Sequence, residues 1–345
     1  MESSKRLDWV DICKAMAIYL MVLGHTGVSE GVNIFIHAFH MPVFFLLSGY
    51  CFNEVKNSDF ISFAKKRFLQ LILPYVIFGI GLFLFWDLSL LVLNRKDEMR
   101  SIYNLIASLL WHNADASAFG VIQWFLTCLF FTELICSVII NRFKNRLKVL
   151  IGILICFSIS AYVYPLIFDF RLPLAIDCAL MAVSFYGLGW LMRKINIDSA
   201  INKIKENKIK FLYGTLFVFV IFLPFVFLNG HVNMRTTTYG NYFLFIINAI
   251  TYSFILLLIS IIIDISSAKL KNIITIVGQN TLVVLLLNST FIRIYQVVFS
   301  KLLSGLSDSY IYAINYFVAL LITIACVIAS KMINRFFPWM IGKKA

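Results

Sequence analysis

Long apolar runs fill most of the chain, and short polar segments separate them. The run Phe254–Ile263, for example, contains no charged residue. Such runs lack the alternation of apolar and polar residues that the strands of an outer-membrane barrel require. A membrane-spanning helix needs about 20 predominantly apolar residues, so the pattern predicts an all-α polytopic membrane protein, a bundle of about ten transmembrane helices. The expected helices cover residues 8–28, 33–53, 69–93, 120–140, 149–168, 173–192, 211–228, 242–264, 273–297 and 311–333.

Composition excludes a soluble protein and a disordered one. Hydrophobic residues make up 61% of the 345 residues and charged residues 14%, against about 25% charged in an ordinary soluble domain. The expected helices use most of the chain, so no stretch remains for a second folded domain. Residues 1–345 are therefore expected to form a single integral-membrane domain without a separate soluble domain.

The net charge of +13 comes from basic clusters in the connections between the apolar runs. If the expected helices cross the membrane in turn, 22 lysines and arginines lie on one side and 7 on the other, with Lys14 inside the first helix. Basic residues gather on the cytoplasmic side, so both termini are predicted to be cytoplasmic. This distribution argues against a nucleic-acid partner and indicates a multi-pass protein of the cell membrane, the inner or plasma membrane of a bacterium.

Two longer polar segments are not expected to cross the membrane. Residues 100–119 are too polar and are predicted to form an outer loop with an interfacial helix. Residues 195–210 are predicted to form a lysine-rich inner loop, suited to contact with anionic lipid.

Ionisable groups inside membrane helices are costly, which makes each a candidate for function. The first expected helix contains Asp11, Lys14 and His25. Lys14 and His25 lie eleven residues apart, so they share a face and are separated by about 16 Å along the helix. Asp11 and Lys14 are three residues apart and can pair. These residues form a polar stripe along the first expected helix. The stripe is either functional or a buried ion pair with one additional histidine.

The second expected helix begins with two more histidines, His37 and His40, followed by Pro42, which loosens the local backbone. In the predicted topology they and His25 lie near the outer side. A three-histidine zinc site is one interpretation. No carboxylate or cysteine lies at ligand spacing, so we favour proton chemistry at one histidine, with the others binding a polar substrate or supporting the fold. We assign no metal ligand.

Other polar residues are predicted on the same outer side. They are Gln123, Trp124, Asp177, Tyr239 and Asn288. The tryptophan and tyrosine are either part of an acceptor pocket or members of the aromatic belt at the membrane surface.

Several of these segments carry a resemblance to the acyltransferase-3 family of integral membrane O-acyltransferases. Lys14, ten residues before Gly24-His25, resembles its first-helix motif, in which the basic residue is usually arginine. Phe39–Tyr50 resembles its second-helix signature. Weaker similarities follow in order at Arg67-Phe68, Pro74-Tyr75, Gln123–Leu126, Phe185–Gly187 and Gly278–Leu282. The match spans residues 6–290 and is most similar to the fucose 4-O-acetylase-like branch, although the family often has histidine where this chain has Asn288.

The resemblance implies transfer of an acyl group, usually acetyl, from acetyl-CoA or another acyl-CoA to a hydroxyl. The implied acceptor is a cell-surface glycan or its lipid-linked sugar precursor, and no tightly bound cofactor is expected. Acyl transfer needs a base and oxyanion donors, and the donor phosphates need cations. We assign catalysis to His25, with His40 and Asp177 in support. The remaining assignments are donor binding at Lys14, Lys66 and Arg67 and acceptor binding at His37, Gln123, Trp124, Tyr239 and Asn288.

Two other classes of protein fit the same polar stripe. One is a transporter or flippase for a polar small molecule or a lipid-linked sugar, and the other is a binding protein without catalysis. The sequence shows no internal repeat of the kind common in transporters, and the Gly24-His25 motif favours the enzyme. The oligomeric state and the acceptor hydroxyl are left open.

Overall fold

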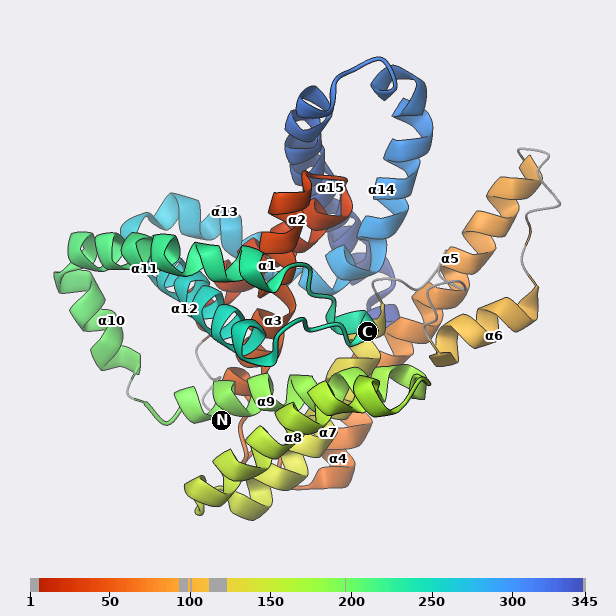
Figure 1. Cartoon of the computed structure of the whole chain (residues 1–345). Helices are drawn as coiled ribbons and strands as arrows, with labels where there is room; N and C mark the ends of the chain where they lie inside the picture. The colour runs from red at the N-terminus through yellow and green to blue at the C-terminus, as the bar shows by residue number, and fades with distance from the viewer. Residues whose placement is uncertain (1–5, 93–98, 100, 112–122, 196, 344–345) are drawn as a thin grey trace. The chain divides into compact units, whose positions relative to one another are not determined.

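The computed structural model describes residues 6–92, 99, 101–111, 123–195 and 197–343 (Figure 1). Nearly all of this part is helical, and its pairing of extended backbone is limited to one isolated bridge between Asn233 and Thr238. Nine helices in the described part are long and apolar enough to cross a membrane. The predicted all-α polytopic membrane architecture is therefore confirmed, while the cytoplasmic placement of the termini stays a prediction.

The first expected helix forms as α1, Asp8–His25. It is not one of the nine, because Asp8, Asp11 and Lys14 make it more polar than the others. The other nine expected helices correspond to the nine that the structure describes. Residues 93, 100, 112–122 and 196, which belong to or adjoin expected segments, lie outside the described residues.

The chain falls into two compact units, and its treatment as a single domain stays a prediction. Unit 1 comprises Met1–Cys51, Leu188–Met234 and Thr238–Ser330. Besides α1, its helices are α2 Glu30–His37, α3 His40–Cys51, α10 Ile197–Glu206, α11 Lys208–Asn229, α12 Tyr242–Ser266, α13 Ala268–Gln279, α14 Thr281–Leu303 and α15 Asp308–Phe336 up to Ser330.

Unit 2 comprises Phe52–Gly187, Arg235–Thr237 and Lys331–Ala345. Its helices are α4 Phe60–Arg67, the π-helix η1 Phe68–Ile72, α5 Leu73–Val92, α6 Ile102–Trp111, α7 Trp124–Phe143, α8 Leu147–Ile167, the 3-10 helix η3 Pro173–Ala175, α9 Ile176–Met192 up to Gly187, and η5 Pro338–Ile341. Helix α7 packs against α4, η1, α8 and η3. Helix α6 forms within the segment expected to be an outer loop, and its interfacial position stays a prediction.

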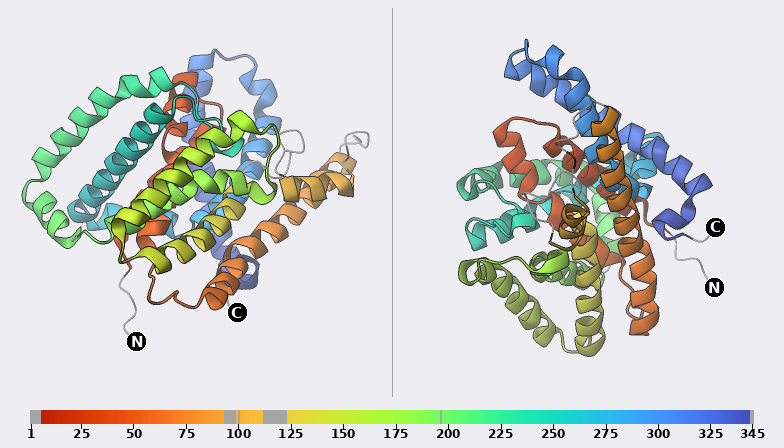
Figure 2. Two further views of the ribbon diagram at one scale, coloured as in Figure 1. Left: turned by 60° about the horizontal axis from the view of Figure 1, so that its bottom comes forward. Right: turned by 90° about the vertical axis from the view of Figure 1, so that its right-hand side faces the viewer.

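Helix α1 is the centre of unit 1, where it packs against α2, α3, α12, α13 and α14. Its backbone comes very close to Gly278 near the end of α13, where an added Cβ would lie 1.9 Å from the backbone oxygen of Asp11. Only glycine leaves room for the two backbones at this distance. Helix α11 lies beside α12 in Figure 1 and in the left view of Figure 2, and the Tyr252 hydroxyl on α12 donates to the Phe219 carbonyl on α11 at 3.0 Å.

Two helices are broken near polar or proline residues. The chain between α2 and α3 forms a turn at residues 38–39, because Pro42 has no amide hydrogen for the Ala38 carbonyl. The expected helix 273–297 is instead interrupted at Asn280, between α13 and α14. There the Asn280 amide donates to the Ile276 carbonyl at 2.7 Å, and its oxygen accepts the Ser330 hydroxyl at 2.7 Å. Such side-chain bonds compete with the helical backbone ladder.

The lysine-rich segment 195–210 was expected to be a loop, and that expectation is wrong. It contains α10, and α11 begins at Lys208. Ile201 and Ile204 lie three residues apart, which is helical spacing, and Ile204 is buried. Exposed Lys203 and Lys205 together with buried Ile204 make α10 a short amphipathic helix.

The close contact at Gly278 generates a prediction about stability. Gly278→Ala places a methyl group against the Asp11 carbonyl, and overpacking of this kind costs about 1–3 kcal/mol. We expect a clear fall in the thermal unfolding midpoint of the purified protein in detergent. Gly152→Ala on α8 is the control, because a Cβ there meets nothing within 4 Å. Equal midpoints for the two variants would show that the α1–α13 contact is not tight.

Candidate functional site

Four histidines of unit 1 lie close together, although they come from separate segments. His25 ends α1, His37 ends α2, His40 begins α3, and His231 follows α11. The ring centroid of His37 lies 4.9 Å from that of His40, 5.1 Å from that of His231 and 6.1 Å from that of His25. His37 is therefore the centre of a four-histidine cluster.

The three helical histidines share one hydrogen-bond pattern. The Nδ1 atom of His25 lies 2.7 Å from the Met21 carbonyl oxygen. Those of His37 and His40 each lie 2.8 Å from a carbonyl oxygen four residues earlier. A carbonyl oxygen only accepts, so each Nδ1 bears the hydrogen. In a neutral imidazole the other nitrogen, Nε2, is then the one able to accept a proton.

Asn33 connects the cluster through three contacts. Its Nδ2 donates to the Gly24 carbonyl at 2.9 Å, and its own carbonyl accepts from His37 Nδ1. Its Oδ1 lies 3.2 Å from His231 Nε2, which must donate because Oδ1 is an acceptor. Sequence reasoning missed both Asn33 and His231. The one available signal was the spacing of Asn33, one helical turn before His37.

Lys14 and Asp11 do not pair as expected. The Asp11 carboxylate is 3% exposed and accepts from Arg6, through Nε and, at 3.2 Å, through Nη2. The two nitrogens of a guanidinium group bind a carboxylate better than a single ammonium does. Half-buried Lys14 forms no hydrogen bond or ion pair with any described residue, so its charge is available to a ligand.

At the N-terminal end of α1, Asp8 contacts another lysine. Lys271 on α13 lies 3.2 Å from a carboxylate oxygen of Asp8 and 3.2 Å from one of Asp264. Hydrogen bonds to these two carboxylates raise the pKa of Lys271. This contact joins the ends of three helices on the side of α1 away from His25.

Asn288 and Tyr239 are buried in unit 1. Asn288 lies on α14, which packs against α1, and its Nδ2 donates to the carbonyls of Val284 and Leu285 at 2.8 Å each. Its Oδ1 has no hydrogen-bond partner among the described residues. Tyr239 packs its ring against Phe245 with centroids 5.1 Å apart. Asn288 therefore presents a buried acceptor, the kind of group that a hydroxyl ligand can satisfy.

Asp177, in unit 2, is held by an ion pair. Its carboxylate accepts from Arg171 and from the Cys178 amide, at 3.0 Å in the second case. Arg171 also donates to the Arg235 carbonyl at 2.6 Å, and burial together with the Arg171 charge lowers the pKa of Arg235. The preceding Leu174 has a φ of 55°, uncommon outside glycine. These contacts fix the backbone at the start of α9, and a catalytic role for Asp177 stays a prediction.

Arg67, assigned to donor binding, also has a carboxylate partner within unit 2. Its Nε and Nη2 both donate to Glu133 on α7, the second at 2.6 Å, and its Nη1 donates to Gln70 at 2.7 Å. Lys66, beside it on α4, is exposed. The guanidinium of Arg67 therefore serves the packing of α4 on α7, while the donor assignment of both residues stays a prediction.

Gln123 and Trp124 mark the beginning of α7 and are both buried. The Gln123 side chain is 2% exposed, and neither its oxygen nor its nitrogen has a partner among the described residues. A buried amide without partners costs free energy, and a polar ligand is the kind of group that can satisfy it. Among the described residues, no group of three histidine, cysteine or acidic side chains is arranged to hold a metal ion.

A comparison with protein families decides the class to which this chain belongs. The acyltransferase domain model of the acyltransferase-3 family matches residues 7–332, nearly the whole length. The chain belongs to the acyltransferase-3 family. No curated protein and no solved structure matches it significantly.

Membership in the acyltransferase-3 family confirms the prediction made from Gly24-His25 and Phe39–Tyr50. The protein is a multi-pass membrane acyltransferase. The fucose 4-O-acetylase-like branch stays a prediction, as do the roles of the individual site residues.

The buried Arg67–Glu133 pair gives a prediction that separates packing from donor binding in this acyltransferase. Arg67→Ala leaves Glu133 buried without a counter-charge, which costs about 3–5 kcal/mol. We expect a large loss of thermal stability in detergent, largely restored in Arg67→Met with Glu133→Leu, because two apolar groups need no partner. Lys66→Ala is the control and should unfold like the wild type. A stable Arg67→Ala protein that binds donor weakly would instead assign Arg67 to the donor site.

Proposed function

We propose that this membrane acyltransferase moves an acyl group, acetyl first among candidates, from acyl-CoA to a hydroxyl group. The proposed acceptor is a cell-surface glycan or its lipid-linked sugar precursor. The observation that supports the proposal best is the bond from His25 Nδ1 to the Met21 carbonyl at 2.7 Å. It orients one imidazole so that Nε2 is the basic nitrogen, which is what removal of a hydroxyl proton requires.

The proposed reaction begins when His25 Nε2 takes the proton of the acceptor hydroxyl. The oxygen attacks the thioester carbonyl and forms a tetrahedral oxyanion. When the oxyanion collapses, the carbon–sulfur bond breaks, and the CoA thiolate takes the proton back from His25. The products are an O-acyl ester and free CoA, so atoms and charge balance without a tightly bound cofactor.

His37 and His40 suit the acceptor better than the oxyanion. Their Nδ1 hydrogens are engaged by backbone carbonyls, so in the neutral form Nε2 offers only a lone pair. A lone pair accepts a hydrogen bond from a sugar hydroxyl but repels an oxyanion. We therefore assign both to acceptor binding, together with the unfilled Oδ1 of Asn288.

Lys14 is the proposed contact for the donor phosphates. It lies on the His25 face of α1, about 16 Å nearer the N-terminus by helical rise. This offset separates a nucleotide bound near the predicted cytoplasmic side from a thioester delivered to His25. Its lack of any partner among the described residues supports this role.

The decisive experiment measures thiol release from acetyl-CoA by purified protein, with and without a glycan acceptor. His25→Ala should lower turnover by about 10²–10⁴-fold, the usual contribution of a general base. His231→Ala is the matched control: it loses a contact to Asn33 and should fall much less. If the wild type releases no thiol, the acyl-CoA proposal fails. If His25→Ala retains its turnover, the base is another member of the cluster.

A second prediction concerns Lys14. Lys14→Ala should raise the KM for acetyl-CoA about 10- to 150-fold, because a charged hydrogen bond contributes roughly 1.5–3 kcal/mol, while kcat changes little. Lys14→Arg should restore most of the affinity, since the positive charge is kept. Lys148→Ala, an exposed lysine at the start of α8, is the control. An unchanged KM in Lys14→Ala would remove this residue from the donor site.

A further inference from the structure

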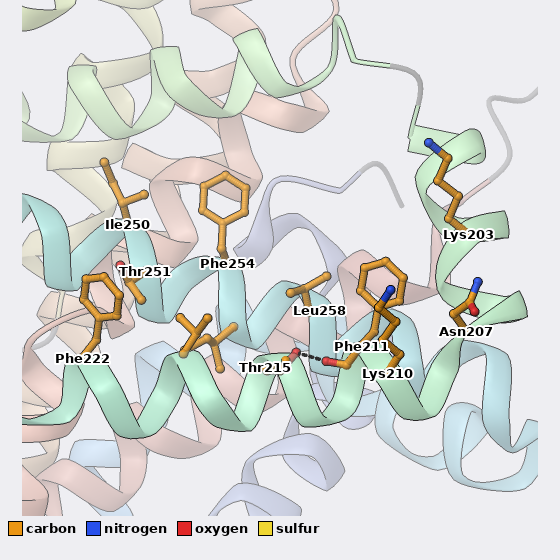
Figure 3. A pocket seen from close by; sticks show the side chains of 13 residues that line it. Lys203, Asn207, Lys210, Phe211, Thr215, Phe222, Ile250, Thr251, Phe254 and Leu258 are labelled. Carbon is orange, nitrogen blue, oxygen red and sulfur yellow. Dashed lines mark hydrogen bonds between the residues drawn. The ribbon is translucent and has the colours of Figure 1, made fainter.

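A groove of about 800 Å³ lies between α11 and α12 in unit 1 (Figure 3). Its walls are formed by Phe211, Val218 and Phe222 on α11 and by Ile250, Phe254 and Leu258 on α12. Volumes of this order are typical of ligand pockets. The Thr215 hydroxyl, which also lines the groove, donates to the Phe211 carbonyl at 2.7 Å and is therefore satisfied. The walls of the groove are therefore suited to an apolar ligand.

One end of this α11–α12 groove is basic. Figure 3 shows Lys203, Asn207 and Lys210 toward the same end, opposite Phe222 and Ile250. Neither lysine forms an ion pair with a described residue. Two unpaired ammonium groups and an amide provide donors for a phosphate, whereas nothing comparable lines the other end.

The length of the groove fits one leaflet of a bilayer. Phe211 and Phe222 are eleven residues apart on a helix, which corresponds to about 16 Å. The hydrocarbon core of a bilayer is about 30 Å thick, so one leaflet contributes about half of that. The basic end belongs to the segment predicted to lie at the cytoplasmic surface. An acyl chain extending from a headgroup there would match the apolar walls along their length.

The surface of α11 is open to the surroundings. Only 11% of its most apolar stretch is buried inside the protein, against 56% for α12. An occupant can therefore enter sideways from the membrane. A soluble phosphate compound would leave the aromatic walls uncovered, and a neutral lipid would leave the two lysines without a partner.

We propose that the α11–α12 groove binds an anionic phospholipid of the cytoplasmic leaflet. The phosphate lies between Lys203 and Lys210, within reach of the Asn207 amide, and one acyl chain lies along the apolar walls. This site does not depend on the proposed acyl-transfer function. Its occupant fills the space between α11 and α12 next to the amphipathic helix α10.

The charged end is tested by lipid retention. The full-length protein in mild detergent is mixed with phosphatidylglycerol or phosphatidylcholine, and bound lipid is measured by native mass spectrometry. The wild type should retain phosphatidylglycerol preferentially. Lys203→Ala with Lys210→Ala should weaken that binding about 30-fold, given the usual contribution of two lysines near anionic headgroups. The control variant, Lys144→Ala with Lys148→Ala, should bind like the wild type.

The apolar part is tested by filling the groove. Gly214 lines it, and a Cβ there meets nothing within 4 Å, so Gly214→Leu fits without a backbone clash. This variant should lose binding of both phosphatidylglycerol and phosphatidylcholine. The control Gly152→Leu, on an equally open face of α8, should lose neither. Glycerol phosphate and acetyl-CoA should not displace the phospholipid. Retention unchanged in the lysine variant, or displacement by acetyl-CoA, would overturn the lipid assignment.

Discussion

A polar group inside the apolar part of a membrane has no water to bind, so the protein itself has to satisfy it. In each charged pair of the described part, the two partners lie a few residues apart in the sequence or on two helices that pack together. Arg6 binds Asp11, Arg67 binds Glu133, and Arg171 binds Asp177. Against this background, the buried groups that the chain leaves unsatisfied are informative. The Asn288 oxygen and the Gln123 amide are buried without a hydrogen-bond partner among the described residues. Half-buried Lys14 has no ion-pair partner there, and all three are positions predicted from the sequence to bind a ligand.

The packing of α1 explains why one helix can hold both proposed ends of the reaction. Its N-terminal half is fixed by the backbone contact with Gly278 and by Lys271. Its C-terminal end is fixed differently: Gly27 has a φ of +86°, and its carbonyl accepts from Asn315 at 2.7 Å. A helix held at both ends keeps the distance from Lys14 to His25 constant. The distance between the proposed phosphate site at Lys14 and the proposed reaction site at His25 is then set by the packing of α1.

The membrane made much of the fold predictable, because bilayer thickness sets the length of an apolar helix. Expected residues 173–192 and 242–264 correspond to segments Pro173–Met192 and Tyr242–Ser266. The Pro42 break was also foreseeable, since proline acts on its own neighbours. In contrast, the break at Asn280 depends on Ser330, fifty residues away. The α10 helix was missed because the prediction of a loop rested on the lysines of segment 195–210 and gave no weight to Ile201 and Ile204, which lie at helical spacing.

Only part of the site was predictable, because local sequence does not encode contacts between residues far apart in the chain. His25, His37 and His40 lie on adjacent segments, so local sequence identifies them. His231 bonds Asn33 across 198 residues, a contact that no local pattern encodes. The same limit applies to Asp11, whose expected partner Lys14 was chosen by helical spacing alone. Arg6 precedes the helix, where spacing rules for side chains no longer apply.

The histidine cluster also limits how many protons the site can hold. Two unit charges about 5 Å apart repel by roughly 3 kcal/mol at an effective dielectric constant near 20. His37 lies 4.9 Å from His40 between ring centroids, so a second imidazolium beside a first is strongly disfavoured. This pair of rings therefore favours one positive charge over two. The proposed acyl transfer to a hydroxyl moves a single proton out and back. A site that favours one positive charge over two suits this proposed chemistry, because it leaves a neighbouring ring as the proposed acceptor for a sugar hydroxyl.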